Sequence, residues 1–98
     1  MTVKINHSLP ITIAQQRIEN KFLSLLTTYQ DEVKQSRMTW SGYTCEFSFT
    51  AKGIKTTGVV RIEPTFCIIK INVPIVLLPF NLRIKSLIEE EGKKVLHE

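Results

Sequence analysis

The sequence predicts an α+β fold, in which two helices, one N-terminal and one C-terminal, cover one face of an antiparallel meander sheet of four to five strands. Apolar and polar residues alternate with a period of two in four successive runs, residues 37–41, 43–50, 54–63 and 66–73, as in strands buried on one side. The runs are joined by short connections, so neighbouring strands should pair antiparallel. Amphipathic segments precede and follow them, and a one-sided apolar sheet needs such a cover.

The composition fits one globular domain spanning residues 1–98. Hydrophobic residues make up 43% of the chain and charged residues 22%, which is ordinary for a folded domain. The net charge of +4 and pI of about 9.3 indicate a lysine-rich surface more than a nucleic-acid-binding one. We find no signal peptide and no run of the ~20 apolar residues needed for a membrane span. The sequence therefore predicts a cytoplasmic protein.

The first part of the chain predicts an edge strand and a long helix. Residues 2–6 alternate like a strand, which Pro10 ends by restricting Leu9 to extended geometry. Thr12, with Gln15 three residues later, resembles a capping box. The helix should continue to about residue 35, because no glycine or proline stops it. Its predicted sheet-facing stripe is Ala14, Ile18, Phe22, Leu25 and Tyr29.

Two features of the meander carry structural expectations. Gly58, next to paired threonines, predicts a bulge or bend. Cys45 and Cys67 lie on the apolar phase of strands that a third strand separates, about 9–10 Å apart. That separation exceeds the reach of a disulfide, so both should be buried thiols.

The last strand passes directly into the second helix. Pro74 should end the strand pairing, and Pro79 suits the first turn of a helix. The apolar stripe of this helix is Phe80, Ile84, Leu87, Ile88 and Val95. Gly92 lies inside the helix, where glycine costs about 1 kcal/mol relative to alanine. It predicts either close packing or early fraying.

The sequence offers no recognisable catalytic chemistry. His7 lies in a loop and His97 near the chain end, and we expect both at the surface. Metal-ligand spacings and a glycine-rich phosphate loop are absent from the sequence. Residues 89–91 are three consecutive glutamates, and on a helix their side chains point in different directions, so they do not converge on one site. We therefore predict a protein that is not an enzyme, without catalytic residues, cofactor or metal.

The polar face of the predicted sheet is a candidate interaction surface. It suits either a weak homodimer or an anionic partner, through Val59, Phe66, Ile68, Lys55, Arg61 and Lys70. RNA-binding sheets combine basic groups with several stacking aromatics. Here one phenylalanine provides the ring, so nucleic acid is not favoured.

Core and turn residues in this order carry a family resemblance. They are His7-Ser8-Leu9 before a helix with Ala14 and Arg17, Trp40-x-Gly42 before a strand ending in Phe47 and Phe49, Gly53 and Gly58 before Val60 and Ile62, and an apolar elbow at residues 73–80 entering a helix with Ile84 and Ile88. This pattern resembles the polyhydroxyalkanoic acid (PHA) system proteins, small bacterial proteins encoded near polyester-storage functions.

The resemblance implies a non-catalytic accessory or interaction protein, associated with PHA granules or with PHA synthesis. Its partner would be the granule surface or another PHA-system protein. A granule presents apolar polymer and amphiphiles, which an exposed amphipathic helix would contact. The candidate contact residues are Leu77, Leu78, Leu82, Arg83 and Lys85.

The alternative function is a lipid- or small-hydrophobic-ligand-binding module of helix-grip type. It requires an internal cavity between the helices and the sheet. In a chain of this size we expect aromatic side chains to fill that space.

Overall fold

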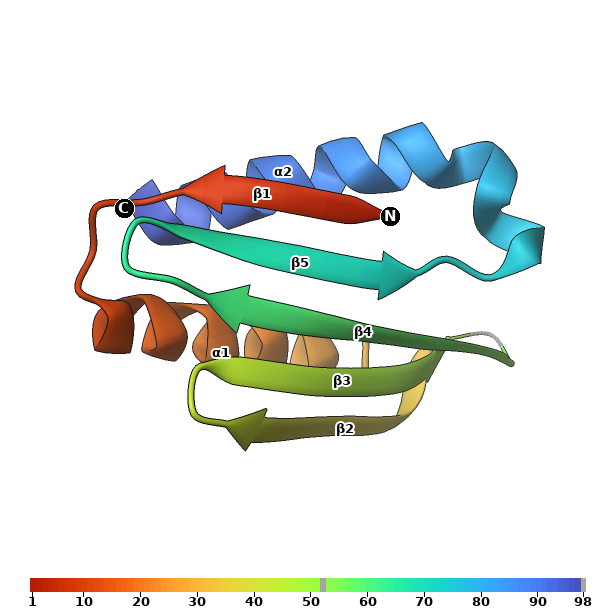
Figure 1. Ribbon diagram of the computed structural model, residues 1–98. Coiled ribbons are helices and arrows are strands. Elements are labelled where there is room, and N and C mark those ends of the chain that lie inside the picture. The colour runs from red at the N-terminus through yellow and green to blue at the C-terminus, as the bar shows by residue number, and fades with distance from the viewer. Residues whose placement is uncertain (52, 98) are drawn as a thin grey trace.

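The computed structural model describes residues 1–51 and 53–97, without the side chains of Leu77, Phe80, Asn81 and Ile84. Along the chain it forms β1 (Thr2–Asn6), α1 (Ile11–Thr28), β2 (Val33–Ser41), β3 (Thr44–Ala51), β4 (Ile54–Ile62), β5 (Phe66–Asn72), the 3₁₀ helix η1 (Ile75–Phe80) and α2 (Asn81–His97) (Figure 1).

The described strands form one five-stranded sheet in the order β1-β5-β4-β3-β2, and each neighbouring pair is antiparallel. The predicted α+β class and antiparallel meander are confirmed. β1 is the expected edge strand, paired with β5 from Thr2 opposite Lys70 to Asn6 opposite Phe66. Cys45 pairs with Val60 and Cys67 with Ile62, so β4 separates the two cysteines. Both are buried free thiols, as predicted.

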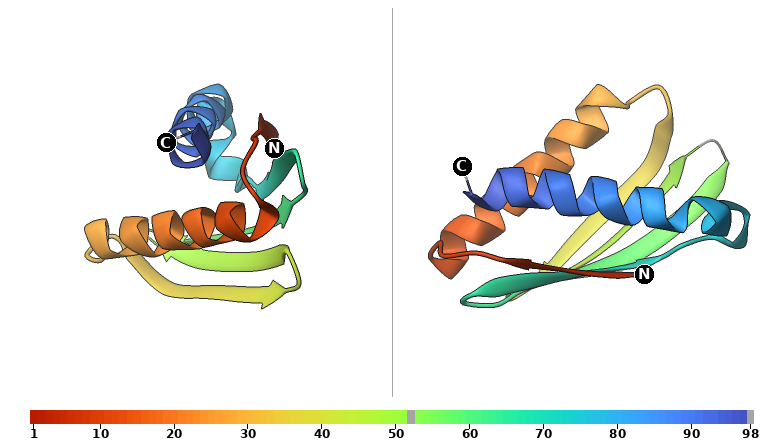
Figure 2. Two further views of the ribbon diagram at one scale, coloured as in Figure 1. Left: turned by 90° about the vertical axis from the view of Figure 1, so that its left-hand side faces the viewer. Right: turned by 90° about the horizontal axis from the view of Figure 1, so that it is seen from above.

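Both helices lie over the same face of the sheet (Figure 2). They come close together near the C-terminal end of α2 and diverge toward its N-terminal end (Figure 2). Where they are close, the Arg17 Nη1 of α1 donates to the Val95 carbonyl of α2 at 3.2 Å. The inner sheet face and both helices share a core of Val3, Ile5, Ala14, Cys45, Phe47, Val60, Ile62, Cys67 and Leu96.

Two glycines mark close packing in this core. A Cβ on Gly92 would collide with the Cδ1 of Ile5, so the glycine lets α2 approach β1. Of the two alternatives predicted for Gly92, close packing is the one observed. Gly58 lies under the ring of Phe47, and β3 pairs residue by residue with β4 on both sides of it. The predicted bulge at Gly58 is therefore wrong: the glycine makes room for an aromatic ring in regular sheet.

The end of α1 differs from the prediction. The helix begins directly after Pro10 and ends at Thr28, not near residue 35. β2 is correspondingly longer, because Val33 already pairs with Ala51. Pairing with β3 outweighs the local helical pattern, a common result of tertiary context. The register shifts between Lys34 and Arg37, and Gln35 has a left-handed φ of 52° there.

The start of α2 also differs. Pro79 lies inside η1, and α2 begins at Asn81. On the predicted stripe of α2, Leu87 is exposed and Ile88 is half-buried against the core, whereas the buried Leu96 was missed. Phe80 and Ile84 belong to the predicted stripe, but their side chains lie outside the described part of the structure.

Candidate functional site

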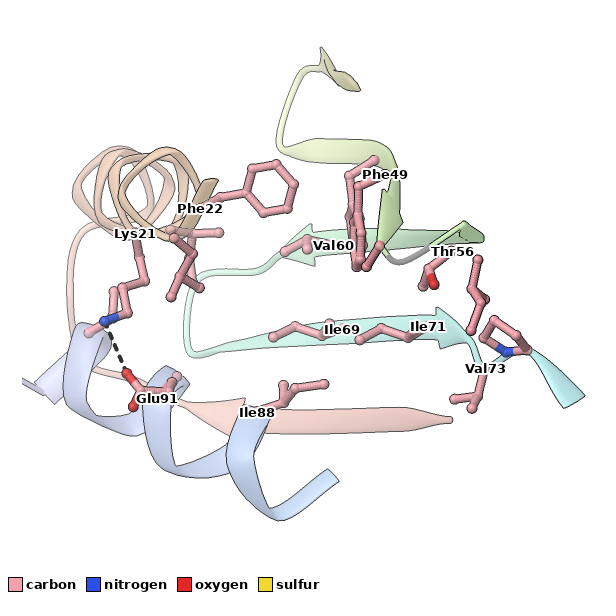
Figure 3. Close-up of a pocket in the computed structure, with 18 residues that line it drawn as sticks. Lys21, Phe22, Phe49, Thr56, Val60, Ile69, Ile71, Val73, Ile88 and Glu91 are labelled. Atoms are coloured by element: carbon pink, nitrogen blue, oxygen red, sulfur yellow. Dashed lines mark ion pairs between the residues drawn. The ribbon is translucent and has the colours of Figure 1, made fainter. Parts of the chain in front are cut away.

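An apolar cleft of about 370 Å³ lies between α1, α2 and the inner face of the sheet. Figure 3 shows its walls and floor. Ile18, Phe22 and Leu25 contribute from α1, and Ile88, Gly92 and Val95 from α2. The floor includes Val60, Ile69, Ile71 and Val73, and the strand residues among these alternate with outward-facing neighbours. The cleft thus uses the apolar phase of the strands and the facing stripes of both helices.

The divergence of the helices leaves this cleft open. Leu25 and Tyr29 belong to the predicted stripe of α1, yet they are 38% and 49% exposed. The aromatic side chains do not fill the interior as expected. Phe47 packs against Phe22 at a ring-centroid distance of 5.5 Å and against Phe49 at 6.4 Å. The three rings gather beside the space, so a cleft remains.

Charged side chains from both helices meet at one end of the cleft, where Lys21 and Glu91 line it and Lys94 lies just outside the lining. The Nζ of Lys21 lies 3.0 Å from one carboxylate oxygen of Glu91, and the Nζ of Lys94 lies 3.8 Å from the other. We call these three residues the charged rim. The hydrogen bond from Lys21, its charge and that of Lys94 lower the pKa of Glu91. Two ammonium groups share one carboxylate, so the rim carries a surplus of one positive charge.

The elbow and the start of α2 expose the predicted contact residues. Leu78 and Leu82 are 52% and 80% exposed, and Arg83 and Lys85 are exposed beside them. The side chain of Leu77, the remaining residue of that prediction, lies outside the described part of the structure.

Two further apolar side chains of the elbow were missed by the sequence reasoning. Ile75 and Val76 are 83% and 63% exposed. The strand pattern ends at Pro74 and no helical pattern has begun, so no periodicity indicated which way they point.

The outer face of the sheet brings together most of its predicted residues. Arg61 pairs with Ile68, and Val59 with Lys70, across β4 and β5. Arg61 is also ion-paired with Glu63 at 2.9 Å. Lys55 pairs with Thr50, toward the far end of β4.

A cation covers the aromatic ring on this face. The Nζ of Lys4 lies 4.6 Å from the ring centroid of Phe66, a contact that the sequence reasoning missed.

His7 is not the surface residue we expected. It is 7% exposed, and its ring makes hydrogen bonds to the backbone of Leu9 in its own loop and of Glu63 after β4. Nδ1 accepts a hydrogen bond from the Leu9 N–H at 3.1 Å. Nε2 therefore carries the proton and donates to the Glu63 carbonyl at 2.8 Å. His7 thus has a structural role in the loop between β1 and α1.

The remaining candidate groups are dispersed. His97 is exposed, with Nε2 2.8 Å from the Asn6 carbonyl oxygen. Burial raises the pKa of Cys67 to about 11, so its thiol is protonated near neutral pH. Within residues 1–51 and 53–97, no three His, Cys, Asp or Glu side chains gather to hold a metal ion. None of the helices in the described part of the chain is long and apolar enough to cross a membrane.

Fold and cleft together define a small α+β protein whose helix pair and antiparallel sheet surround an apolar space of ligand size. A family model described as "Putative polyhydroxyalkanoic acid system protein" matches residues 1–96. The chain therefore belongs to this family, as its sequence pattern indicated. Comparison with curated proteins and with solved structures found no match.

Proposed function

We propose that the protein is a non-catalytic accessory protein of bacterial PHA metabolism that acts in the cytoplasm at the surface of PHA granules. Membership in the PHA system family supports the metabolic context. The direct contact with the granule rests on one observation, the exposed apolar side chains of η1 and the start of α2.

The contact surface, here called the elbow surface, consists of Ile75, Val76, Leu78, Leu82, Arg83 and Lys85. Large exposed apolar patches on soluble proteins mark interaction sites, and the four exposed apolar side chains of this surface come from one segment, residues 75–82. Ile75 and Leu82 are at least four-fifths exposed, at 83% and 80%. The cationic Arg83 and Lys85 beside them suit a surface that carries anionic amphiphiles, as interfacial helices do.

Co-sedimentation with isolated PHA granules tests this proposal. Burying a leucine side chain is worth about 1.5–3 kcal/mol, so Leu82→Ser should weaken granule binding by about tenfold to a hundredfold. Leu23→Ser is the matched control, because Leu23 is an exposed leucine of α1, 49% accessible. Bare liposomes separate granule binding from general lipid binding. Absence of binding to granules, or equal loss in both variants, would refute direct contact and direct the search to a protein partner of the PHA system.

A second function is favoured by the cleft itself. We propose that it takes up a small hydrophobic ligand between helices and sheet. Ligand sites typically enclose about 300–1,000 Å³ and are lined mostly by apolar side chains. The cleft, at about 370 Å³, falls within that range and is lined by apolar side chains except for Lys21, Thr56 and Glu91.

Weak self-association through the outer sheet face stays a prediction, as does the expectation that nucleic acid is not a partner. Sedimentation velocity at increasing protein concentration checks the first. The hydrophobic residues of that face, Val59, Phe66 and Ile68, are half-buried within the single chain. A dimer that Ile68→Lys disrupts would support the self-association.

A further inference from the structure

We infer that the ligand of the cleft is a single aliphatic chain ending in one carboxylate, the chemistry shared by fatty acids and hydroxyalkanoic acids. The carboxylate binds at the charged rim, and the tail follows β5 toward Pro74. This inference rests on the second function proposed above, since it requires the cleft to take up a hydrophobic ligand. It adds the chemical class, the orientation and the residues that recognise the head group.

The dimensions of the cleft suit a chain of medium length. Ile69, Ile71 and Val73 follow one another along its floor, away from Lys21 and Glu91 (Figure 3). At about 3.3 Å per residue, the distance from Ile69 to Val73 is about 13 Å, close to an extended chain of about ten carbons. A dry cavity of about 150 Å³ holds one benzene molecule. By proportion, about 370 Å³ holds roughly 15 non-hydrogen atoms, enough for a carboxylate and such a tail.

The lining favours an aliphatic tail over a polar ligand. Beyond the charged rim, Thr56 contributes the one hydroxyl among the described lining residues. It lies across the cleft from Lys21 and Glu91 (Figure 3). Burying further polar groups of a ligand in this space without hydrogen-bond partners would cost free energy. A chain with all its polar atoms at one end avoids that cost.

The charged rim supplies the recognition of the head group. Lys21 comes from α1 and Lys94 from α2, and both ammonium groups face Glu91. An ammonium carries three N–H donors, so Lys21 can hold Glu91 and a second carboxylate together. Glu91 repels that second carboxylate, and Lys94, which lies outside the lining of the cleft, offsets this repulsion because its ammonium group is 3.8 Å from Glu91. An amine head group would meet the opposite balance and be disfavoured.

Isothermal titration calorimetry with monomeric decanoate, decanol and decyltrimethylammonium tests the inference. We expect decanoate to bind at least fivefold tighter than decanol, and decyltrimethylammonium to bind weakest. The preference is modest because the side chains of Lys21 and Glu91 are 36% and 41% exposed, and exposed charge pairs contribute little. A parallel titration with 3-hydroxydecanoate compares a hydroxyalkanoic acid with a fatty acid. Tighter binding of either acid than of decanol supports the inference.

Matched variants place the head and the tail. Lys21→Met should weaken decanoate about fivefold and leave decanol unchanged, whereas Lys55→Met, on the outer sheet face, should change neither. Ile71→Trp fills the cleft and should abolish binding of both probes. Ile68→Trp is its control, since Ile68 lies on the same strand and points to the opposite face. Far-UV circular dichroism confirms that each variant is folded.

The outcomes separate the two proposals. Equal affinity for decanol and decanoate, or no effect of Lys21→Met, would overturn the carboxylate assignment and leave the hydrophobic-ligand function standing. Absence of binding to all probes, or undiminished binding by a folded Ile71→Trp variant, would overturn both. A dimer that dissociates in Ile71→Trp would also overturn both, because a second copy would then occupy the cleft.

Discussion

The contact between Gly92 and Ile5 predicts an unusual response to a glycine-to-alanine change inside a helix. An exposed Gly→Ala substitution in a helix stabilises a protein by about 1 kcal/mol. At Gly92 the new methyl group would collide with the Cδ1 of Ile5, whose side chain is 2% exposed. Overpacking a core in this way costs about 1–3 kcal/mol. We therefore expect Gly92→Ala to lower the free energy of unfolding by up to about 2 kcal/mol.

A second substitution separates the two effects. Ile5→Val removes the methyl group that the alanine meets and, by itself, should cost about 0.5–1.5 kcal/mol. In the double variant the alanine methyl fills the vacated space and the helix gains its propensity. The double variant should therefore be more stable than the sum of the single changes predicts, by about 1–3 kcal/mol.

Urea denaturation followed by far-UV circular dichroism measures all four proteins of this cycle. Equal denaturant slopes would show that the unfolded states are comparable. A Gly92→Ala variant that is stabilised by the full helix-propensity gain, with strictly additive effects in the double variant, would refute the close approach of α2 to β1. It would also remove the reason for the position of α2 beside the cleft.

Three further predictions concern single residues. The pKa of Cys67 is raised from 9.0 to about 11, so the thiol's contribution to stability is present below pH 9 and lost as the pH rises toward 11. Urea denaturation should therefore show the free energy of unfolding falling by up to about 3 kcal/mol over that range, and the fall should be absent in Cys67→Ala. Gln35 has a φ of 52°, so Gln35→Gly should raise the free energy of unfolding by up to about 1 kcal/mol and Gln35→Val should lower it. A higher melting temperature for the valine variant than for the glycine variant would contradict backbone strain at this position. The pKa of Glu91 is lowered by Lys21 and Lys94, so its small stabilising effect is present above pH 4.5 and lost as the pH falls through the lowered value; NMR titration of Glu91 should show its pKa rising in Lys21→Met.

The strands were predictable because their signal is local. Successive side chains of a strand point to opposite faces whatever the rest of the chain does, so Cys45, Phe47 and Phe49 share the inner face. The separation of the cysteines followed from the same pattern. Family membership was also visible in the sequence, because its marks are core and turn residues in a fixed order.

The errors lie where a distant partner decides the local structure. The helical pattern continues beyond Thr28, but the chain forms β2 there because Val33 pairs with Ala51 of β3. Gly58 has the sequence context of a bulge, but its lack of a side chain makes room for the ring of Phe47. His7 is buried because Glu63, 56 positions away, supplies an acceptor. None of these partners can be read from the neighbouring sequence.

The candidate sites divide in the same way. The sequence by itself determined the apolar phase of the strands that form the floor of the cleft. It also indicated Leu78, Leu82, Arg83 and Lys85 of the elbow surface, but the exposure of Ile75 and Val76 was decided by the tertiary structure. The tertiary structure decided that the cleft is open and that its rim is charged. The helices converge where Gly92 lets α2 approach β1 and where Lys21 meets Glu91, and they diverge beyond. The angle between two helices depends on contacts between residues far apart in the chain, which no local pattern specifies.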